Sequence, residues 1–154
     1  MTIQIGDRLP EGILQEGTPS NKHQVSELFA GKKAIIFAVP GAFTPGCSNT
    51  HLPSYLEKAD DFLSQGYDFI ACLAVNDAFV MGAWGQDRQV GDKITMLADP
   101  LAEFTKALGL EVHSGNLGTR SKRYSMVVED GVITQLNLEP DSFGLTCSLA
   151  SEID

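Results

Sequence analysis

Residues 40–48 combine the residue types and spacing that thiol chemistry requires. They read Pro-Gly-Ala-Phe-Thr-Pro-Gly-Cys-Ser. Thr44 suits a helix N-cap and Pro45 the first helical position, which places Cys47 in the first turn. Unpaired backbone N–H groups and the positive end of the helix dipole favour an anion there, and the thiolate is the nucleophilic form of cysteine. Since Gly46 has no side chain to obstruct a small substrate, we predict an activated cysteine.

A second interpretation of Cys47 is structural. A cysteine between a strand and a helix is often a small buried hydrophobic residue. The surrounding residues favour reactivity, because prolines, a threonine and glycines crowd into a short segment where no core requires them.

Two strands and a helix are expected to position this segment. Residues 34–39 and 68–75 are continuous apolar runs, typical of strands buried on both faces. Between them, residues 44–65 read as mostly helical and end at Gly66. This order is a βαβ unit, and ligands bind outside the carboxyl ends of strands in such sheets.

Further elements follow along the chain. Asn76 or Asp77 can cap a helix over residues 78–84, and residues 94–98 read as another strand. Asp99 is then expected to cap a helix that begins at Pro100. Leu101, Phe104 and Leu108 are expected on the apolar face of that helix, and Gly109 is expected to end it.

A hairpin completes the predicted sheet. Residues 124–128 and 132–138 flank Glu129-Asp130-Gly131, and Asp-Gly supplies the tight turn. The resulting fold class is α/β, with a mixed central sheet flanked by helices in a single domain over residues 1–154. Pro53 is expected to kink or interrupt the helix that carries Cys47.

Composition limits the classes of partner. The chain of 154 residues has a formal net charge of -9, which disfavours nucleic acid and anionic membrane surfaces. No window approaches the ~20 apolar residues of a membrane span, and the N-terminus lacks the pattern of a signal peptide. We therefore expect a cytoplasmic protein. In that reducing compartment, three cysteines are more often reactive or buried than bridged.

The segment around Cys47 resembles a known family. Pro40-x3-Thr44-x2-Cys47 matches the active-site pattern of peroxiredoxins, and the longer string to Pro53 is similar to the type-5 subfamily, called type II in plants. The similarity covers nearly the whole chain, and includes residues 72–80, 97–100, 122–128 and 144–149. It implies a thioredoxin-like fold and a thiol-dependent peroxidase that needs no cofactor or metal. The chain has no Cys-x-x-Cys, so a thioredoxin-type reductase is not expected.

The resemblance also implies roles for individual residues. Cys47 attacks hydrogen peroxide or a small alkyl hydroperoxide and becomes a sulfenic acid. The Thr44 hydroxyl and the Cys47 N–H bind the peroxide oxygens, while Pro40 shields the sulfur from water. The family's arginine falls on Arg123, whose permanent charge can hold thiolate and peroxide together. Arg120 is the rival candidate.

Two further cysteines could resolve the sulfenic acid. Cys72 lies four residues before Asn76, about 13 Å deeper in its strand, whereas a disulfide needs α-carbons within ~7 Å. We therefore expect Cys72 to be a core residue. The surroundings of Cys147 resemble animal type-5 enzymes, in which a cysteine here forms an intramolecular disulfide. Plant relatives place a second cysteine at the position of Cys72, and bacterial relatives can rely on glutathione or glutaredoxin.

The sequence leaves the partners and a rival function open. The resemblance implies thioredoxin, or glutaredoxin with glutathione, as reductant, and a homodimer with Phe43 and Phe79 as interface candidates. Cys47 and His51 have the spacing of two metal ligands, but a structural zinc needs four. A redox sensor that uses oxidation of Cys47 as a signal is the alternative to an enzyme.

Overall fold

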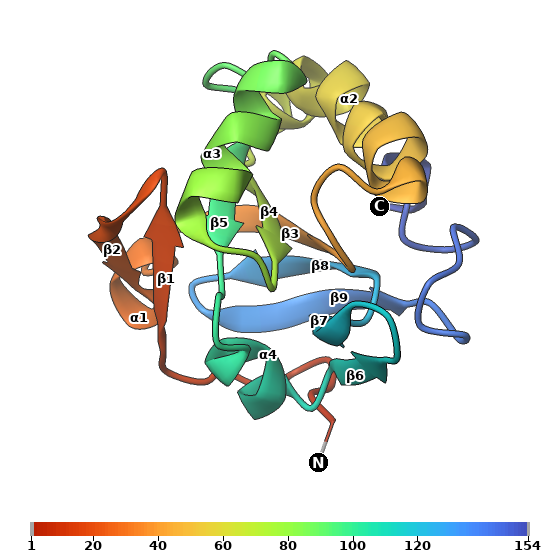
Figure 1. The fold of residues 1–154 in the computed structure, drawn as a ribbon. Helices are drawn as coiled ribbons and strands as arrows, with labels where there is room; N and C mark the ends of the chain where they lie inside the picture. The colour runs from red at the N-terminus through yellow and green to blue at the C-terminus, as the bar shows by residue number, and fades with distance from the viewer. Residues whose placement is uncertain (1, 154) are drawn as a thin grey trace.

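A seven-stranded mixed β-sheet forms the centre of the molecule (Figure 1). The structure is a computed structural model that describes residues 2–153. The strand order is β2-β1-β5-β4-β3-β8-β9, and β6 and β7 form a separate pair. The strands are β1 (Ile13–Glu16), β2 (Thr18–Gln24), β3 (Lys33–Val39), β4 (Phe69–Ala74), β5 (Thr95–Ala98), β6 (Glu111–Ser114), β7 (Gly118–Ser121), β8 (Tyr124–Glu129) and β9 (Val132–Leu138).

Helices lie on both faces of this sheet (Figure 1). They are α1 (Val25–Leu28), the π-helix η1 (Cys47–His51), α2 (Leu52–Ser64), α3 (Ala78–Asp87), α4 (Glu103–Leu108) and the 3₁₀-helix η2 (Ala150–Glu152). Residues of α2 and α3 pack in one core cluster, and residues of α1 and α4 pack in the other. The predicted mixed sheet flanked by helices is confirmed.

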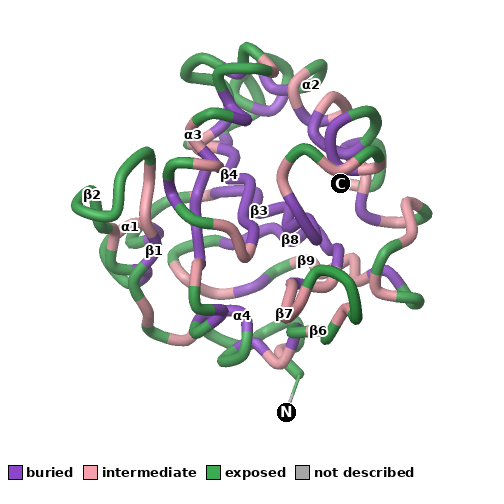
Figure 2. The backbone as a smooth tube through the Cα atoms, viewed as in Figure 1, coloured by how far each residue is buried: buried purple, intermediate pink, exposed green. Residues whose placement is uncertain are grey.

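Strand β3 is the central element, because both of its faces are covered. It pairs parallel with β4 and antiparallel with β8. Ile35, Phe37 and Val39 point into one core cluster, whereas Ala34, Ile36 and Ala38 point into the other. Figure 2 shows the buried strands β3, β4 and β8 in the middle of the molecule. This alternation explains the continuous apolar run in the sequence.

The predicted βαβ unit and hairpin are both present. The two parallel strands β3 and β4 are joined through η1 and α2. Strands β8 and β9 are antiparallel, with Asp130 at φ 49° and Gly131 at φ 79° between them. These left-handed values explain why Asp-Gly occupies the turn.

The helix predicted to begin at Pro100 begins later, at Glu103. Ala102 takes a left-handed conformation, and Leu101 is 71% exposed and so not on the buried face. Asp99 still serves the first turn, because its carboxylate accepts the Phe104 N–H at 3.3 Å and the Thr105 N–H at 2.8 Å. Asp99 therefore caps α4 with its side chain although residues 100–102 separate it from the start of the helix.

Candidate active site

Cys47 lies in the first turn of the helical segment that follows β3. The chain becomes helical at Pro45, and the Ser48 N–H donates to the Thr44 carbonyl at 2.8 Å. The Cys47 side chain is fully buried, at 0% exposure. The predicted position of Cys47 at the start of a helix is therefore confirmed.

The turn that begins at Cys47 is wider than an α-helical turn. Cys47–His51 is a π-helix in which the Leu52 N–H donates to the Cys47 carbonyl, five residues earlier. Pro53 lacks an N–H, and its ring disfavours the regular α-helical register one turn earlier. The expected interruption at Pro53 thus takes the form of a change in register, and α2 continues to Ser64. Single π turns of this kind are frequent at functional sites.

Arg123 is the cationic partner of Cys47. It immediately precedes β8, whose Tyr124 pairs with Ala38 near the end of β3, so it arrives where the loop to Cys47 begins. Its Nη2 donates to Cys47 Sγ at 3.3 Å, and its Nε donates to the Phe143 carbonyl at 3.2 Å. Arg123 is only 4% exposed, so the charge acts on the sulfur with little screening by water.

Arg120 has a different task. Its Nη1 donates to the Val75 carbonyl at 3.1 Å and its Nε to the Leu117 carbonyl at 3.0 Å. It thereby joins the β6–β7 hairpin to the end of β4. The structure brings Arg123, and not Arg120, into hydrogen-bond contact with Cys47.

His51 fixes the orientation of Arg123, a role that its spacing from Cys47 in the sequence did not indicate. Its Nε2 lies 3.1 Å from the Ser148 carbonyl and its Nδ1 2.9 Å from Arg123 Nη1. A carbonyl only accepts and a guanidinium only donates, so His51 carries its proton on Nε2. Burial, with the charge of Arg123, lowers the pKa of His51 to about 3. The imidazole is therefore neutral, and both nitrogens are engaged by the protein.

Thr44 and Pro40 lie at the two ends of the loop that joins β3 to the helix of Cys47. The Thr44 hydroxyl donates to the Gly41 carbonyl at 2.7 Å, and the helix begins directly after Thr44, at Pro45. Its oxygen lone pairs stay available as acceptors. Pro40 is buried at the end of β3.

Gly46 provides room for the arginine. A Cβ placed on Gly46 would lie 3.3 Å from Arg123 Nη2 and 3.6 Å from Leu145 Cδ1. The space beside Gly46 is thus filled by the protein, whereas the sequence suggested a space left for substrate. The missing side chain allows the guanidinium to approach Cys47.

Cys147 lies in a segment that Glu139 holds. The Cys147 N–H donates to Glu139 Oε2 at 2.9 Å, and the Cys147 thiol donates to the Leu138 carbonyl at 3.4 Å. Cys147 is half-buried, and all three cysteines are unbridged. Burial and the nearby Glu139 carboxylate raise the pKa of the Cys147 thiol.

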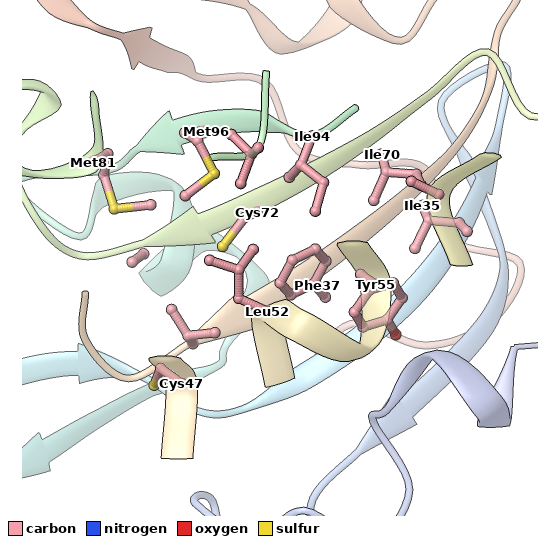
Figure 3. Close-up of a cluster of buried hydrophobic side chains, with 14 of the residues drawn as sticks. Ile35, Phe37, Cys47, Leu52, Tyr55, Ile70, Cys72, Met81, Ile94 and Met96 are labelled. Atoms are coloured by element: carbon pink, nitrogen blue, oxygen red, sulfur yellow. The ribbon is translucent and has the colours of Figure 1, made fainter. Parts of the chain in front are cut away.

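Cys72 is a core residue, as predicted. It lies in β4 between Phe37 of β3 and Met96 of β5 and is fully buried. Figure 3 shows its sulfur among the apolar side chains, while Cys47 stands at the edge of the same cluster. Burial, together with the nearby Cys47, raises the pKa of Cys72 well above its ordinary value.

Three aromatic residues lie in the loop before the helix of Cys47 and in α3. Phe43 has a left-handed backbone at φ 64° and is 52% exposed, and Phe79 at the start of α3 is 62% exposed. Trp84 is fully buried, and its indole N–H donates to Ser48 Oγ at 2.9 Å. The Phe43 and Trp84 ring centroids are 6.4 Å apart.

Neither a metal site nor a membrane span is found in the part of the chain that the structure describes. Within residues 2–153, no group of three or more His, Cys, Asp or Glu side chains could hold a metal ion. No helix in the same range is long and apolar enough to cross a membrane.

Comparison with known proteins assigns a family to this site. The sequence profile of the Redoxin family matches residues 4–149. The chain is 45% identical over 161 residues to peroxiredoxin-2E-2, chloroplastic, of Oryza sativa subsp. japonica, covering 99% of this chain and 71% of the relative. The chain belongs to the peroxiredoxins. It is also 47% identical over 146 residues to peroxiredoxin-2E, chloroplastic, of Arabidopsis thaliana, covering 90% of this chain. It spans 62% of that relative's own length.

A solved structure agrees closely with this peroxiredoxin. The crystal structure of reduced Prx3 in complex with hydrogen peroxide from Vibrio vulnificus is 48% identical, with a TM-score of 0.92 over 98% of this chain and 96% of the other. The predicted type II subfamily and thioredoxin-like fold are confirmed. Peroxiredoxins are thiol peroxidases, so the expected class of enzyme is confirmed as well.

Proposed function

We propose that this peroxiredoxin reduces hydrogen peroxide and small organic hydroperoxides at Cys47. The observation that carries the proposal is the 3.3 Å contact between Arg123 Nη2 and Cys47 Sγ in a buried site. A guanidinium keeps its charge at every relevant pH, so it stabilises the thiolate and the charge that develops on the peroxide.

The first step forms an S–O bond and breaks the O–O bond. The thiolate of Cys47 attacks one peroxide oxygen, and the other oxygen leaves as hydroxide or alkoxide and takes up a proton. Cys47 is oxidised to a sulfenic acid, and the peroxide is reduced to water or an alcohol. The relative crystallised in reduced form with hydrogen peroxide supports this choice of substrate.

Thr44, Gly46 and Pro40 assist this step. Because the Thr44 hydroxyl proton is donated to Gly41, its oxygen accepts a hydrogen bond from the peroxide O–H. Gly46 lets the guanidinium reach the substrate and the sulfur together. Pro40 excludes water from the far side.

Cys147 then resolves the sulfenic acid. Its thiol attacks Cys47, releases water and forms an intramolecular disulfide, which thioredoxin reduces. The rival route has no protein resolving thiol, and glutathione with glutaredoxin reduces Cys47 directly. Cys147 is favoured because it is half-buried in a loop segment, whereas Cys72 is enclosed in the sheet.

Turnover with each reductant separates these routes. We would measure peroxide consumption with thioredoxin or with glutaredoxin and glutathione for the wild type, Cys72→Ser and Cys147→Ser. Only Cys147→Ser should lose turnover with thioredoxin. A Cys47–glutathione adduct, with no loss of two protons from the protein in non-reducing mass spectrometry, would support the rival route. A rate of Cys47 oxidation no faster than that of free cysteine would indicate a redox sensor.

The same proposal covers assembly and location. Phe43 and Phe79 are exposed apolar side chains, and burial of both against a second copy would form a homodimer. Sedimentation of the wild type and Phe79→Ser tests this, with a shift to monomer expected. The expected location is the reducing cytoplasm, where three cysteines are more often reactive or buried than bridged, and cell fractionation would test it.

A further inference from the structure

The carboxylate of Glu139 is enclosed by three consecutive residues of the Cys147 segment. Oε1 accepts the Thr146 N–H at 2.9 Å and the Thr146 hydroxyl at 2.7 Å. Oε2 accepts the Cys147 N–H at 2.9 Å, the Ser148 N–H at 2.8 Å and the Ser148 hydroxyl at 2.6 Å. Glu139 itself follows β9 and is 1% exposed.

This carboxylate is a charged group held without a cationic partner among residues 2–153. Burial acts to raise the pKa of Glu139, but the hydrogen bonds from Ser148, Thr146 and Cys147 outweigh it and lower the pKa to about 2. Glu139 is therefore ionised under physiological conditions. Hydrogen bonds to an ionised acceptor are roughly twice as strong as neutral ones.

The Cys147 segment is also held from the side of the catalytic helix. The Ser148 carbonyl accepts hydrogen bonds from His51 Nε2 at 3.1 Å and from the Tyr55 hydroxyl at 2.6 Å. His51 in turn contacts Arg123, and Arg123 contacts Cys47. Two side chains thus lie between the Cys147 segment and the reactive sulfur.

The geometry opposes a direct approach of Cys147 to Cys47. The Cys147 thiol is directed at the Leu138 carbonyl, at 3.4 Å, while the Cys47 sulfur accepts from Arg123. A Cys147 thiol that turns toward Cys47 gives up its bond to the Leu138 carbonyl, and a shift of its backbone in that direction gives up the bond from its N–H to Glu139. That shift leaves a buried carboxylate with fewer donors, which is costly until the segment has moved or water has entered.

We propose that Glu139 is a positioning residue that holds residues 146–148 and thereby limits the rate at which Cys147 reacts with the Cys47 sulfenic acid. The proposal rests on the proposed role of Cys147 as the resolving thiol. Two reactions compete for this sulfenic acid. Cys147 can attack the sulfenic acid and release water, or a second peroxide can oxidise it to a sulfinic acid and be reduced itself to water or an alcohol.

Glu139→Gln tests this directly, because the amide nitrogen donates where Oε2 or Oε1 accepts. Stopped-flow oxidation with one equivalent of hydrogen peroxide resolves sulfenic acid formation from the subsequent disulfide formation. We expect the first rate constant to stay within about twofold and the second to rise about tenfold or more. The fraction of sulfinic acid at excess peroxide, measured by mass spectrometry, should fall accordingly. An unchanged or slower second step in a folded variant would overturn the proposal.

The matched control is Glu129→Gln, which removes the charge of an exposed glutamate at the end of β8 and should leave both steps unchanged. Ser148→Ala removes one hydrogen bond to Oε2 and should accelerate the second step in the same direction to a smaller extent. It keeps the proposal testable if Glu139→Gln does not fold.

Alkylation of Cys147 separates this proposal from the proposed function. In a Cys47→Ser background, Glu139→Gln should raise the rate at which iodoacetamide labels Cys147 about tenfold. Faster labelling without any Cys47–Cys147 disulfide in the peroxide-treated wild type would refute the resolving role and leave the hold by Glu139 supported. If the wild type forms the disulfide but Glu139→Gln does not change the labelling rate of Cys147, the proposal that Glu139 holds residues 146–148 is refuted.

Discussion

The residue that distinguishes this site is an arginine whose three nitrogens are all committed to the protein before substrate arrives. Nε donates to the Phe143 carbonyl, Nη1 to His51 and Nη2 to the Cys47 sulfur. The planar guanidinium is thereby held in one orientation, which a flexible lysine ammonium could not maintain. Preorganised charge of this kind requires no rearrangement as the reaction proceeds.

Substitution of the two arginines should have unequal effects. We expect Arg123→Gln to lower the second-order rate constant for hydrogen peroxide by about 10²-fold or more, because a charge beside the reacting atoms is lost. Arg120→Gln removes two bonds to backbone carbonyls and should keep most of the rate. Stopped-flow measurement of Cys47 oxidation decides between them. The reverse order of effects would show that Arg120 is the catalytic cation.

Gly46→Ala should lower the rate of reaction with peroxide without lowering the free energy of unfolding. The new Cβ would lie 3.3 Å from Arg123 Nη2 and displace the guanidinium by a few tenths of an ångström, so we expect the peroxide rate to fall about tenfold. The backbone of Gly46 is helical, so the free energy of unfolding should stay equal or rise by up to ~1 kcal/mol. Gly115→Ala, where nothing lies within 4 Å, is the control. Equal rates for the two variants would contradict this account of Gly46.

At the scale of elements, the site depends on helix starts packed at the ends of β3 and β4. The π-helix carries Cys47 and His51, and α3 supplies Trp84, which binds Ser48. Helix α3 begins at a regular cap, because the Asp77 carboxylate accepts the Val80 N–H at 2.9 Å. The stability of α3 therefore helps to hold Trp84 against Ser48, the residue next to Cys47.

Loss of this cap should destabilise the protein without touching the reactive groups. Asp77→Ala should lower the free energy of unfolding by about 1 kcal/mol, measured by urea denaturation. Asp87→Ala, at the other end of α3, removes a largely exposed ion pair with Arg88 at 3.4 Å and should change it by less than ~0.5 kcal/mol. Equal losses in the two variants would contradict a capping role for Asp77.

The elements show what a sequence can and cannot predict. Strands β3 and β4 and the Asp130–Gly131 turn were predictable, because their signals are local. Strand β2 was missed because Thr18–Gln24 is an exposed edge strand without apolar alternation. Strands β6 and β7 form a short pair outside the main sheet and give an equally weak signal.

The site residues were predictable from the sequence only where their partners lie nearby in the chain. The position of Cys47 followed from its neighbours in sequence, but Arg123 lies 76 residues away and was identified only through family resemblance. The spacing of His51 from Cys47 suggested no role beyond an incomplete metal site, because its partners Arg123 and Ser148 come from distant segments. Glu139 gave no local signal, since its role exists only once residues 146–148 surround it.

For the whole molecule, the buried polar network makes folding sensitive to acid. His51 is enclosed between the sheet and α2 as a neutral base, and unfolding exposes it to protonation. Its pKa is lowered from 6.5 to about 3 in the folded protein by burial and by Arg123. The stability associated with neutral His51 is therefore complete above pH 6.5 and is lost as the pH falls toward 3.

Acid titration of the unfolding free energy should reveal this group. Between about pH 7 and about pH 5, the free energy of unfolding should fall by about 2 kcal/mol through protonation of His51 in the unfolded chain. His51→Asn should start from a lower stability and show a correspondingly smaller fall. His113→Asn, at an exposed position in β6, is the control. An identical fall in His51→Asn would mean that other groups cause the acid sensitivity.

The contact between Trp84 and Ser48 gives this peroxiredoxin an optical reporter of its own. The chain contains a single tryptophan, and its indole binds the residue next to Cys47. Unwinding of the helix start would break that hydrogen bond and wet the indole, so the emission of one natural fluorophore follows the local structure around the sulfur. Any step of the catalytic cycle that unwinds this helix start should therefore change the tryptophan emission, without any attached label.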